Sequence, residues 1–303
     1  MTFRLGTRGS PLALLQAEMV KAALIAAHGW GEDDVTIVTI STRGDRDRVA
    51  PLTEMGGKAV WTKELDRALL NGETDASVHS MKDVESDPHR PEGLGIAAML
   101  PRADVRDRLI GADSVEALPQ GAMIGTASPR RAAQLKRLRP DIATTLLRGN
   151  VATRLAAVAE GRVYATLLAA AGLSRLGSDE GSAIPVETLL PAPAQGAIGI
   201  DARADDERAR LLLAAIDHGD TSRAVRLERA FTAALGGDCH SPVAALAKMD
   251  GDRARLRAAL YAEDGSDEIS RDVTLAAEDH AGAATLARTM LAEAPASIAG
   301  LFD

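Results

Sequence analysis

The chain has 303 residues, a net charge of −8 at pH 7 and an isoelectric point of about 5.4. This acidic balance argues against a protein that coats nucleic acid or an anionic membrane, and no apolar run approaches the roughly 20 residues of a membrane span. The length predicts two or three domains, and 46% apolar but only 2% aromatic residues predict cores of Ala, Leu, Val and Ile.

The cationic side chains indicate a class of ligand, and the cysteine content indicates a cellular compartment. Of the 35 Lys and Arg residues, six are lysines, which leaves 29 arginines. A GC-rich genome explains much of this bias, but arginine also binds carboxylate or phosphate with two parallel hydrogen bonds. The single cysteine excludes an intrachain disulfide and favours a reducing compartment. Because the first residues contain no long apolar stretch, we expect no signal peptide.

A predicted strand over residues 3–7 leads into a well-marked helix start. Ser10 suits the N-cap, Pro11 suits the first helical turn, and Gly29 is a plausible helix end. Arg8 therefore lies with Ser10 at a strand-to-helix corner, where helix amides favour an anion. A plain capped turn explains the same pattern equally well.

A charged loop follows the next predicted strand, residues 35–40. It contains Gly56-Gly57-Lys58, but the spacing of a nucleotide-binding P-loop is absent. We therefore interpret this loop as a flexible lid that carries Lys58. A predicted helix over residues 62–70 and a predicted strand over residues 94–99 flank the stretch with the most reactive side chains.

That stretch is Val78-His79-Ser80-Met81-Lys82-Asp83-Val84, which combines an imidazole, a hydroxyl, an ammonium and a carboxylate. It follows a short apolar run, and open α/β sheets place their chemistry where a strand opens into a polar loop. Asp83 can there hold a cationic intermediate or exchange protons. A polar loop with an adjacent Lys/Asp pair is the alternative interpretation.

A second series of strands and helices begins near residue 102 and repeats the first corner. A predicted strand over residues 122–126 leads to Ser128-Pro129-Arg130-Arg131, again with a serine N-cap, a proline and an arginine. This likeness to Arg8-Gly9-Ser10-Pro11 predicts two similar domains that face one cleft. Further arginines follow predicted strands at residues 143–147 and 163–168.

Together these arginines predict a cleft for several carboxylates or phosphates, although each one alone also fits a solvated helix end. They are Arg8, Arg130, Arg131, Arg148, Arg154 and Arg175.

After a proline-rich crossing segment at residues 190–196, a predicted strand over residues 197–200 suggests that the chain returns to complete its first domain. From residue 243 the pattern predicts three strands and a helix, a small α+β unit. The predicted domains are residues 1–98 with 197–216, residues 103–192, and residues 218–303.

Cys239 lies in the loop Gly236-Gly237-Asp238-Cys239-His240-Ser241-Pro242. A lone cysteine is usually a small buried hydrophobe, but this loop follows a predicted helix and favours an accessible thiol. Adjacency to His240 does not place a base against the sulfur, so a protease-like pair is weakly supported. The six histidines are scattered without metal-ligand spacing. A thiol that carries a covalent adduct remains open.

Several motifs occur in one order along the chain. They are Thr7-Arg8-Gly9-Ser10-Pro11-Leu12-Ala13-Leu14, Thr42-Arg43-Gly44-Asp45, Gly56-Gly57-Lys58, Val78-His79-Ser80-Met81-Lys82-Asp83, Ser128-Pro129-Arg130-Arg131, Leu147-Arg148-Gly149-Asn150, Ala171-Gly172-Leu173-Ser174-Arg175-Leu176 and Gln195-Gly196-Ala197, with the cysteine loop near residue 239. This order closely resembles the porphobilinogen deaminase family, from about residue 4 to beyond residue 242.

The resemblance implies a monomeric cytoplasmic transferase of tetrapyrrole biosynthesis. It would join four porphobilinogen molecules head to tail into the linear hydroxymethylbilane, with release of four ammonia molecules. The implied fold is α/β, with two lobes similar to type II periplasmic binding proteins and a small C-terminal α+β domain. The implied cofactor is a dipyrromethane held by a thioether, and no metal is implied. Transient transfer of the product to uroporphyrinogen III synthase is expected. No nucleic-acid partner and no membrane partner are expected.

Residue by residue, the resemblance implies Asp83 as the catalytic carboxylate and Cys239 as the cofactor anchor. Lys58 would be the lysine of the mobile lid, with Trp61 at a position that is usually aromatic. Groups expected to bind the cofactor, the substrate or the growing chain are Arg8, Ser10, Lys58, Ser80, Lys82, Ser128, Arg130, Arg131, Arg148, Gly149, Asn150, Arg154, Arg175 and Gln195.

Elementary chemistry agrees with this assignment. Porphobilinogen carries two carboxylates, so a growing chain needs many cationic partners. Loss of ammonia leaves a cation that a nearby carboxylate stabilises, and a sulfur tether keeps the growing end near one site. Four positions depart from the family pattern: Glu54, Glu85, Ser174 and Asp238. None of them replaces an expected site residue, but Glu54 weakens the electrostatic role expected of the lid.

Two other classes of function fit the sequence less well. A two-lobed binding protein for a small anion would have the same architecture, but it would not need Cys239 or the Lys82-Asp83 pair. A regulatory ligand-binding module would normally bring a basic DNA-binding helix, and the sequence contains no candidate for one.

Overall fold

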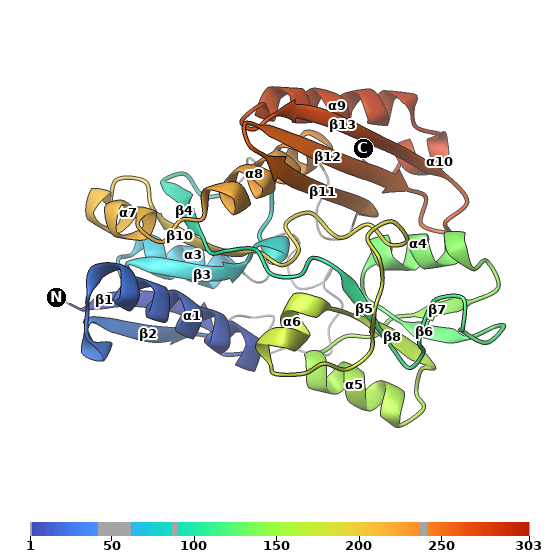
Figure 1. Cartoon of the computed structure of the whole chain (residues 1–303), viewed down its shortest axis with the longest axis horizontal. Coiled ribbons are helices and arrows are strands. Elements are labelled where there is room, and N and C mark those ends of the chain that lie inside the picture. The colour runs from blue at the N-terminus through green and yellow to red at the C-terminus, as the bar shows by residue number, and fades with distance from the viewer. Residues whose placement is uncertain (1, 42–61, 87–89, 237–240, 303) are drawn as a thin grey trace. The chain divides into compact units, whose positions relative to one another are not determined.

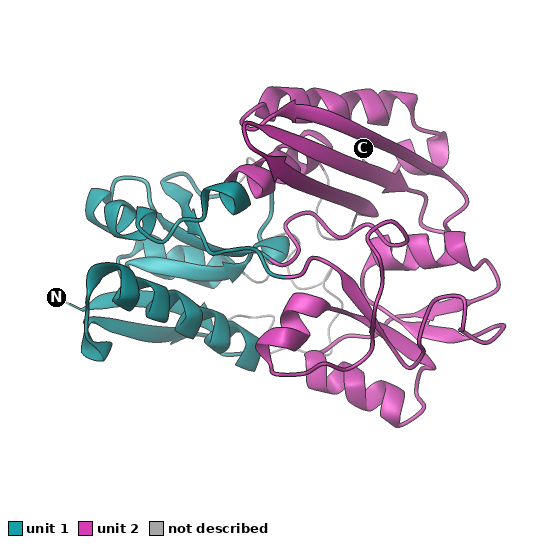
Figure 2. Ribbon diagram, viewed as in Figure 1, with its two compact units in different colours: residues 1–103, 197–222 teal, residues 104–196, 223–303 magenta. Residues whose placement is uncertain are grey.

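A computed structural model describes residues 2–41, 62–86, 90–236 and 241–302 of the chain (Figure 1). These residues form two five-stranded sheets and one three-stranded sheet. No helix among them is both long and apolar enough to cross a membrane. The chain divides into two compact units, which Figure 2 shows in teal and magenta.

The first unit comprises residues 1–103 and 197–222 and is built on a mixed sheet of order β2-β1-β3-β10-β4. Its strands are β1 (Phe3–Arg8), β2 (Val35–Ile40), β3 (Ala76–Ser80), β4 (Leu94–Met99) and β10 (Ile198–Arg203). Strand β1 pairs in parallel with β2 and β3, whereas β10 pairs antiparallel with β3 and β4. Strand β10 therefore brings the chain back to the sheet of the first unit.

Helices α1 (Pro11–His28) and α3 (Lys63–Leu70) begin within one residue of where the sequence predicts them. The unit also contains α7 (Glu207–Ala214) and the 3-10 turns η1 (Glu32–Asp34) and η3 (Met81–Asp83). The Ser10 hydroxyl accepts the Ala13 amide at 3.3 Å, and Gly29 ends α1 in the left-handed conformation at φ 64°. Residues of α1 and α7, Leu24 and Leu213 among them, pack on the sheet in one buried core.

The second unit contains a sheet of the same plan, in the order β7-β6-β8-β5-β9. Its strands are β5 (Asp107–Ile110), β6 (Met123–Gly125), β7 (Ala143–Thr145), β8 (Ala165–Ala169) and β9 (Ser182–Ala183), and its helices are α4 (Pro129–Leu138), α5 (Val151–Ala159) and α6 (Ala170–Arg175). As in the first sheet, four strands run in one direction and one strand runs antiparallel to them. Strand β5, which the sequence did not predict, is the antiparallel strand.

The three-stranded sheet also belongs to the second unit. Its antiparallel strands are β11 (Val243–Asp250), β12 (Arg253–Tyr261) and β13 (Glu268–Ala276), accompanied by α8 (Gly219–Ala234), α9 (His280–Glu293) and α10 (Ala296–Ala299). Phe231 of α8, Leu256 of β12 and Met290 of α9 are fully buried in one core. The predicted small α+β unit is confirmed, with strands longer than the sequence indicated.

Candidate active site

In the first unit, four of the predicted site residues line one small cavity. Arg8, Ser10, Ser80 and Asp83 belong to the end of β1, the start of α1, the end of β3 and the turn η3. Because β1 and β3 run parallel, their carboxyl ends reach the same edge of the sheet. The cavity has a volume of about 60 Å³. It combines a carboxylate with a guanidinium and two hydroxyls.

The turn that carries Asp83 is seated on strand β10. Met81 is 1% exposed, and its amide donates to the Ala197 carbonyl at 3.1 Å. A Cβ atom at Gly199 would lie only 2.0 Å from the Met81 sulfur. A glycine at position 199 therefore makes room for Met81, and Met81 in turn fixes the turn that holds Asp83.

Gln16 belongs to this cavity and was missed from the sequence. Its side chain is 2% exposed, and its amide nitrogen donates to the Ser80 hydroxyl at 2.7 Å. The buried face of α1 contains Ala13, Gln16, Ala17, Val20 and Leu24, whereas Leu15 and Met19 are substantially exposed. A polar residue at helical spacing on an apolar face was the available signal.

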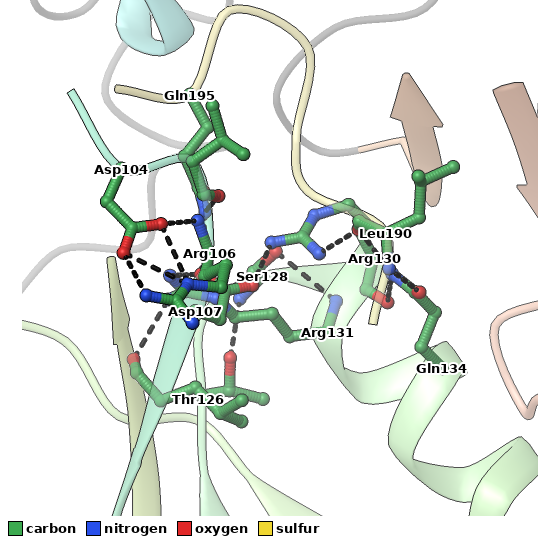
Figure 3. Close-up of polar contacts among 12 residues, drawn as sticks. Asp104, Arg106, Asp107, Thr126, Ser128, Arg130, Arg131, Gln134, Leu190 and Gln195 are labelled. Carbon is green, nitrogen blue, oxygen red and sulfur yellow. Dashed lines mark hydrogen bonds and ion pairs between the residues drawn. The ribbon is translucent and has the colours of Figure 1, made fainter. Parts of the chain in front are cut away.

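In the second unit, Arg130 and Arg131 converge on one buried carboxylate, that of Asp107 (Figure 3). Arg130 Nη2 lies 2.7 Å from Asp107 Oδ2, and Arg131 Nη2 lies 2.6 Å from Asp107 Oδ1. Each guanidinium also donates to a main-chain carbonyl, that of Leu190 for Arg130 and that of Leu167 for Arg131. The sequence predicted both arginines but not Asp107, because Asp107 lies on the unpredicted strand β5.

Gln195 completes this network from the crossing segment. Its amide nitrogen donates to Asp107 Oδ1 at 2.8 Å and to the Val105 carbonyl at 2.7 Å, and the side chain is 1% exposed. Burial alone would raise the pKa of Asp107, but the positive charges of Arg131 and Arg130 outweigh it and hold that pKa well below its usual range. Asp107 therefore stays a carboxylate and orients both arginines.

The cluster keeps an excess of positive charge. One carboxylate faces two guanidinium groups, and the Nε atoms of Arg130 and Arg131 are buried without a hydrogen-bond partner among the described residues. Burial also lowers the pKa of Arg130, although an arginine keeps its charge at any physiological pH. Such a group favours the approach of an anion.

Arg175, at the end of α6, is a partly buried cation in the same unit. Its Nη2 donates to the Gly196 carbonyl at 2.7 Å, and its Nε has no hydrogen-bond partner among the described residues. Burial lowers the pKa of Arg175 to about 10, and no described carboxylate offsets that shift. The folded chain therefore carries a desolvated positive charge at this position.

We expect Arg175→Met to weaken substrate binding without destabilising the protein. Removing a desolvated charge should raise the free energy of unfolding by roughly 1–3 kcal/mol, while a carboxylate ligand loses its partner. Thermal unfolding and KM measure the two effects. Arg162→Met, which removes the exposed partner of Glu160, is the matched control and should change neither. A large loss of stability in Arg175→Met would contradict this interpretation.

The start of α5 places three more predicted residues together. Asn150 caps the helix, and its side-chain oxygen accepts the Thr153 amide at 2.9 Å, while Arg154 Nε donates to the Gly149 carbonyl at 3.0 Å. Gly149 has φ 111°, and a Cβ atom there would lie 2.7 Å from a Thr153 methyl, so glycine is required. Arg148 precedes this corner and is partly buried.

Ser128 and Lys82 are the remaining predicted site residues that the structure describes. Ser128 caps α4 by accepting the Arg131 amide at 3.4 Å, and Lys82 lies partly buried in η3 between Met81 and Asp83. Lys58 and Cys239 lie outside the described residues, as do Trp61 and the departures Glu54 and Asp238.

The chain matches two family models and two curated relatives that carry the same family name. The family model described as "Porphobilinogen deaminase, dipyromethane cofactor binding domain" matches residues 3–211, and "Porphobilinogen deaminase, C-terminal domain" matches residues 222–294. The porphobilinogen deaminase of Sphingopyxis alaskensis is 55% identical, with 99% of this chain and 96% of the relative covered. That of Paracoccus denitrificans is 47% identical over 97% of this chain and 95% of the relative.

Among solved structures, a periplasmic substrate-binding protein of an ABC transporter from Coxiella burnetii matches 71% of this chain and 92% of its own, with 16% identity and a TM-score of 0.44. The methionine-binding protein MetQ matches 71% of this chain and 89% of its own, with 13% identity and the same TM-score.

Proposed function

The chain belongs to the porphobilinogen deaminase family, and we propose that it joins four porphobilinogen molecules head to tail into linear hydroxymethylbilane. Each joining step forms a carbon–carbon bond from the aminomethyl carbon of one porphobilinogen and releases its nitrogen as ammonia. One water molecule supplies the terminal hydroxyl group. The observation that carries the proposal is the cavity where Asp83 meets Arg8, Ser10 and Ser80.

The residues of the second unit fit a cofactor that carries several carboxylates. Among the described residues, Arg130 and Arg131 share a single carboxylate and their buried Nε atoms have no hydrogen-bond partner, and no carboxylate offsets the desolvation of Arg175. Cationic donors of this kind favour acetate and propionate groups. When bound through the sulfur of Cys239, a dipyrromethane supplies the primer on which the product grows. Arg130, Arg131 and Arg175 would hold its carboxylates or those of the growing chain.

Asp83 is the catalytic residue of the proposal. As ammonia leaves the aminomethyl carbon of porphobilinogen, positive charge develops on that carbon and on the pyrrole ring. A fixed carboxylate at this point stabilises the charge and can accept a proton at either carboxylate oxygen. Met81 and Gly199 hold the turn in place, so the carboxylate needs little reorganisation during the reaction.

Arg8 and Ser10 would orient the substrate beside that carboxylate. Arg8 ends β1 and Ser10 caps α1, so both line the cavity near the start of this helix, where main-chain amides and the helix dipole favour an anion. A carboxylate of porphobilinogen bound there would leave its aminomethyl group free to face Asp83. Ser80, which is hydrogen-bonded to Gln16, would add a hydroxyl to the same wall. Lys82, Ser128, Arg148, Gly149, Asn150, Arg154 and Gln195 are further proposed binding groups, and Lys58 the proposed lid lysine.

We also propose three domains: residues 1–98 with 197–216, residues 103–192, and residues 218–303. Three separate sheets, each with its own buried core, support this division. A monomer that acts in the cytoplasm and passes its product to uroporphyrinogen III synthase completes the proposal. Size-exclusion chromatography with light scattering tests the monomer.

The first experiment is the intact mass of protein purified from cells that make porphobilinogen, followed by peptide mapping. An added mass of two linked porphobilinogen units on Cys239 and release of one ammonia for each porphobilinogen consumed are expected. An unmodified thiol that porphobilinogen does not convert, with no ammonia released, would overturn the proposal. It would favour a binding protein for small anions that keeps the fold without the chemistry.

A further inference from the structure

A buried cluster of charged side chains lies in the first unit, next to the cavity that holds Asp83. Arg90 Nη2 lies 2.9 Å from Asp66 Oδ1 and 2.7 Å from Asp201 Oδ2. His79 Nε2 lies 3.3 Å from the same Asp201 oxygen. The side chains of Asp201, Asp66 and His79 are at most 4% exposed, and that of Arg90 is 14% exposed.

The cluster joins three elements of the first unit, and one of them, β3, also lines the cavity. Asp66 is on α3, His79 on β3 and Asp201 on β10, and Figure 1 shows β3 beside β10. Arg90 comes from the segment between η3 and β4. His79 itself lines the cavity, and the next residue, Ser80, begins the turn that ends at Asp83. A shift of His79 would therefore be passed directly to the catalytic turn.

Arg90 supplies the positive charge that this arrangement needs. Asp66, His79 and Asp201 offer ligand atoms within 4.8 Å of one another, a spacing that would also suit a metal ion. The Arg90 guanidinium already lies between the two carboxylates at hydrogen-bond distance, so the chain provides its own cation there. We therefore assign no metal to this cluster.

The balance of charges makes Arg90 hard to replace. Burial raises the pKa of Asp66, and the nearby negative charge of Asp201 raises it further. Arg90 and His79 act in the opposite direction, but the pKa of Asp66 stays raised. Burial would raise the pKa of Asp201 as well, but His79 and Arg90 outweigh it and leave that pKa lowered. Without Arg90, two buried carboxylates would face each other with His79 alone to compensate.

We propose that Arg90 is a positioning residue for Asp83. Arg90 holds Asp201 against His79 and so fixes the end of β3. The proposal rests on the proposed function, because turnover of porphobilinogen is one of its readouts. The mutual repulsion of Asp66 and Asp201 is what Arg90 suppresses. Protonation of Asp66 at low pH should suppress it too, so the loss of Arg90 should matter more as the pH rises.

The test compares Arg90→Met with Arg203→Met. Arg203, two residues beyond Asp201, also ties β10 to its surroundings, but through the Leu69 and Thr74 carbonyls and Asp206 rather than through Asp201. Arg90→Met should lower kcat about 10- to 100-fold at pH 8.5, with KM within about twofold of the wild type. The ratio of variant to wild-type kcat should rise as the pH is lowered, because the pKa of Asp66 is raised and its protonation removes the repulsion. Arg203→Met should lower the unfolding temperature and leave kcat and its pH profile unchanged.

A double variant distinguishes the repulsion between Asp66 and Asp201 from the loss of the Arg90 side chain itself. Arg90→Met with Asp66→Asn removes one carboxylate along with its partner and leaves the Asp201–His79 pair. This double variant should regain most of the wild-type kcat and its pH profile. It also keeps the proposal testable if Arg90→Met alone does not fold.

Three outcomes would overturn the proposal: wild-type kcat in Arg90→Met at every pH, equal losses of kcat in Arg90→Met and Arg203→Met, or no recovery in the double variant. The ¹⁵N chemical shifts of the His79 ring report the Asp201–His79 pair without any turnover. If the wild type consumes no porphobilinogen, the proposed function fails. Unchanged ring shifts in Arg90→Met at pH 8.5 would then still refute the positioning role.

Discussion

Asp83→Asn should reduce turnover of porphobilinogen by about 10²- to 10⁴-fold while the protein stays folded. Asparagine keeps the shape and part of the hydrogen bonding of aspartate but removes the negative charge. The charge is what a cation that forms during ammonia loss requires. Asp83 is only partly buried, and Met81 rather than Asp83 seats the turn on β10, so we expect little change in the unfolding temperature.

Steady-state release of ammonia and thermal unfolding measure the two effects. Glu85→Gln is the matched control, because it removes another partly buried carboxylate two residues further along the chain. The control should keep turnover within about twofold of the wild type, as expected for a substitution away from the chemistry. Turnover of Asp83→Asn at the rate of the control would remove Asp83 from the mechanism.

Asp107→Asn should destabilise the protein by about 3–5 kcal/mol, because it removes the one carboxylate between two buried guanidinium groups. Arg130 and Arg131 would lose their ion pairs, and an amide N–H would face a cationic donor. Chemical denaturation measures the loss. Asp104→Asn is the control: Asp104 pairs with Arg106 in the same region, but the two side chains are 37% and 46% exposed. We expect the control to cost less than about 1 kcal/mol.

The dependence of stability on pH provides an independent check of Asp107. Because its pKa is lowered on folding, the ionised carboxylate contributes stability above its unfolded pKa of about 3.8, and this contribution is lost as the pH falls further. The wild type should therefore lose stability as the pH falls below about 4 more steeply than Asp107→Asn does. Parallel curves would show that Asp107 does not titrate as the buried partner of both arginines.

Local signals in the sequence were sufficient for the helix starts and for most strands. Ser10 and Ser128 cap the helices that they were expected to begin, because a cap depends on hydrogen bonds within three residues. Strand β5 was missed because Asp107-Arg108-Leu109-Ile110 is short and half charged. Its place between β8 and β9 depends on partners far along the chain, at Ala169 and Ala183.

The sequence by itself determined the family, the corners where strands meet helices, and Asp83 as the carboxylate at the end of a strand. Those features depend on residue types at short spacing. Only the tertiary structure decided which charges neutralise each other. Asp107 reaches Arg130 across 23 residues, and Arg90 reaches Asp201 across 111. A buried ion pair depends on which segments the fold brings together in low dielectric, and no local pattern records that distance.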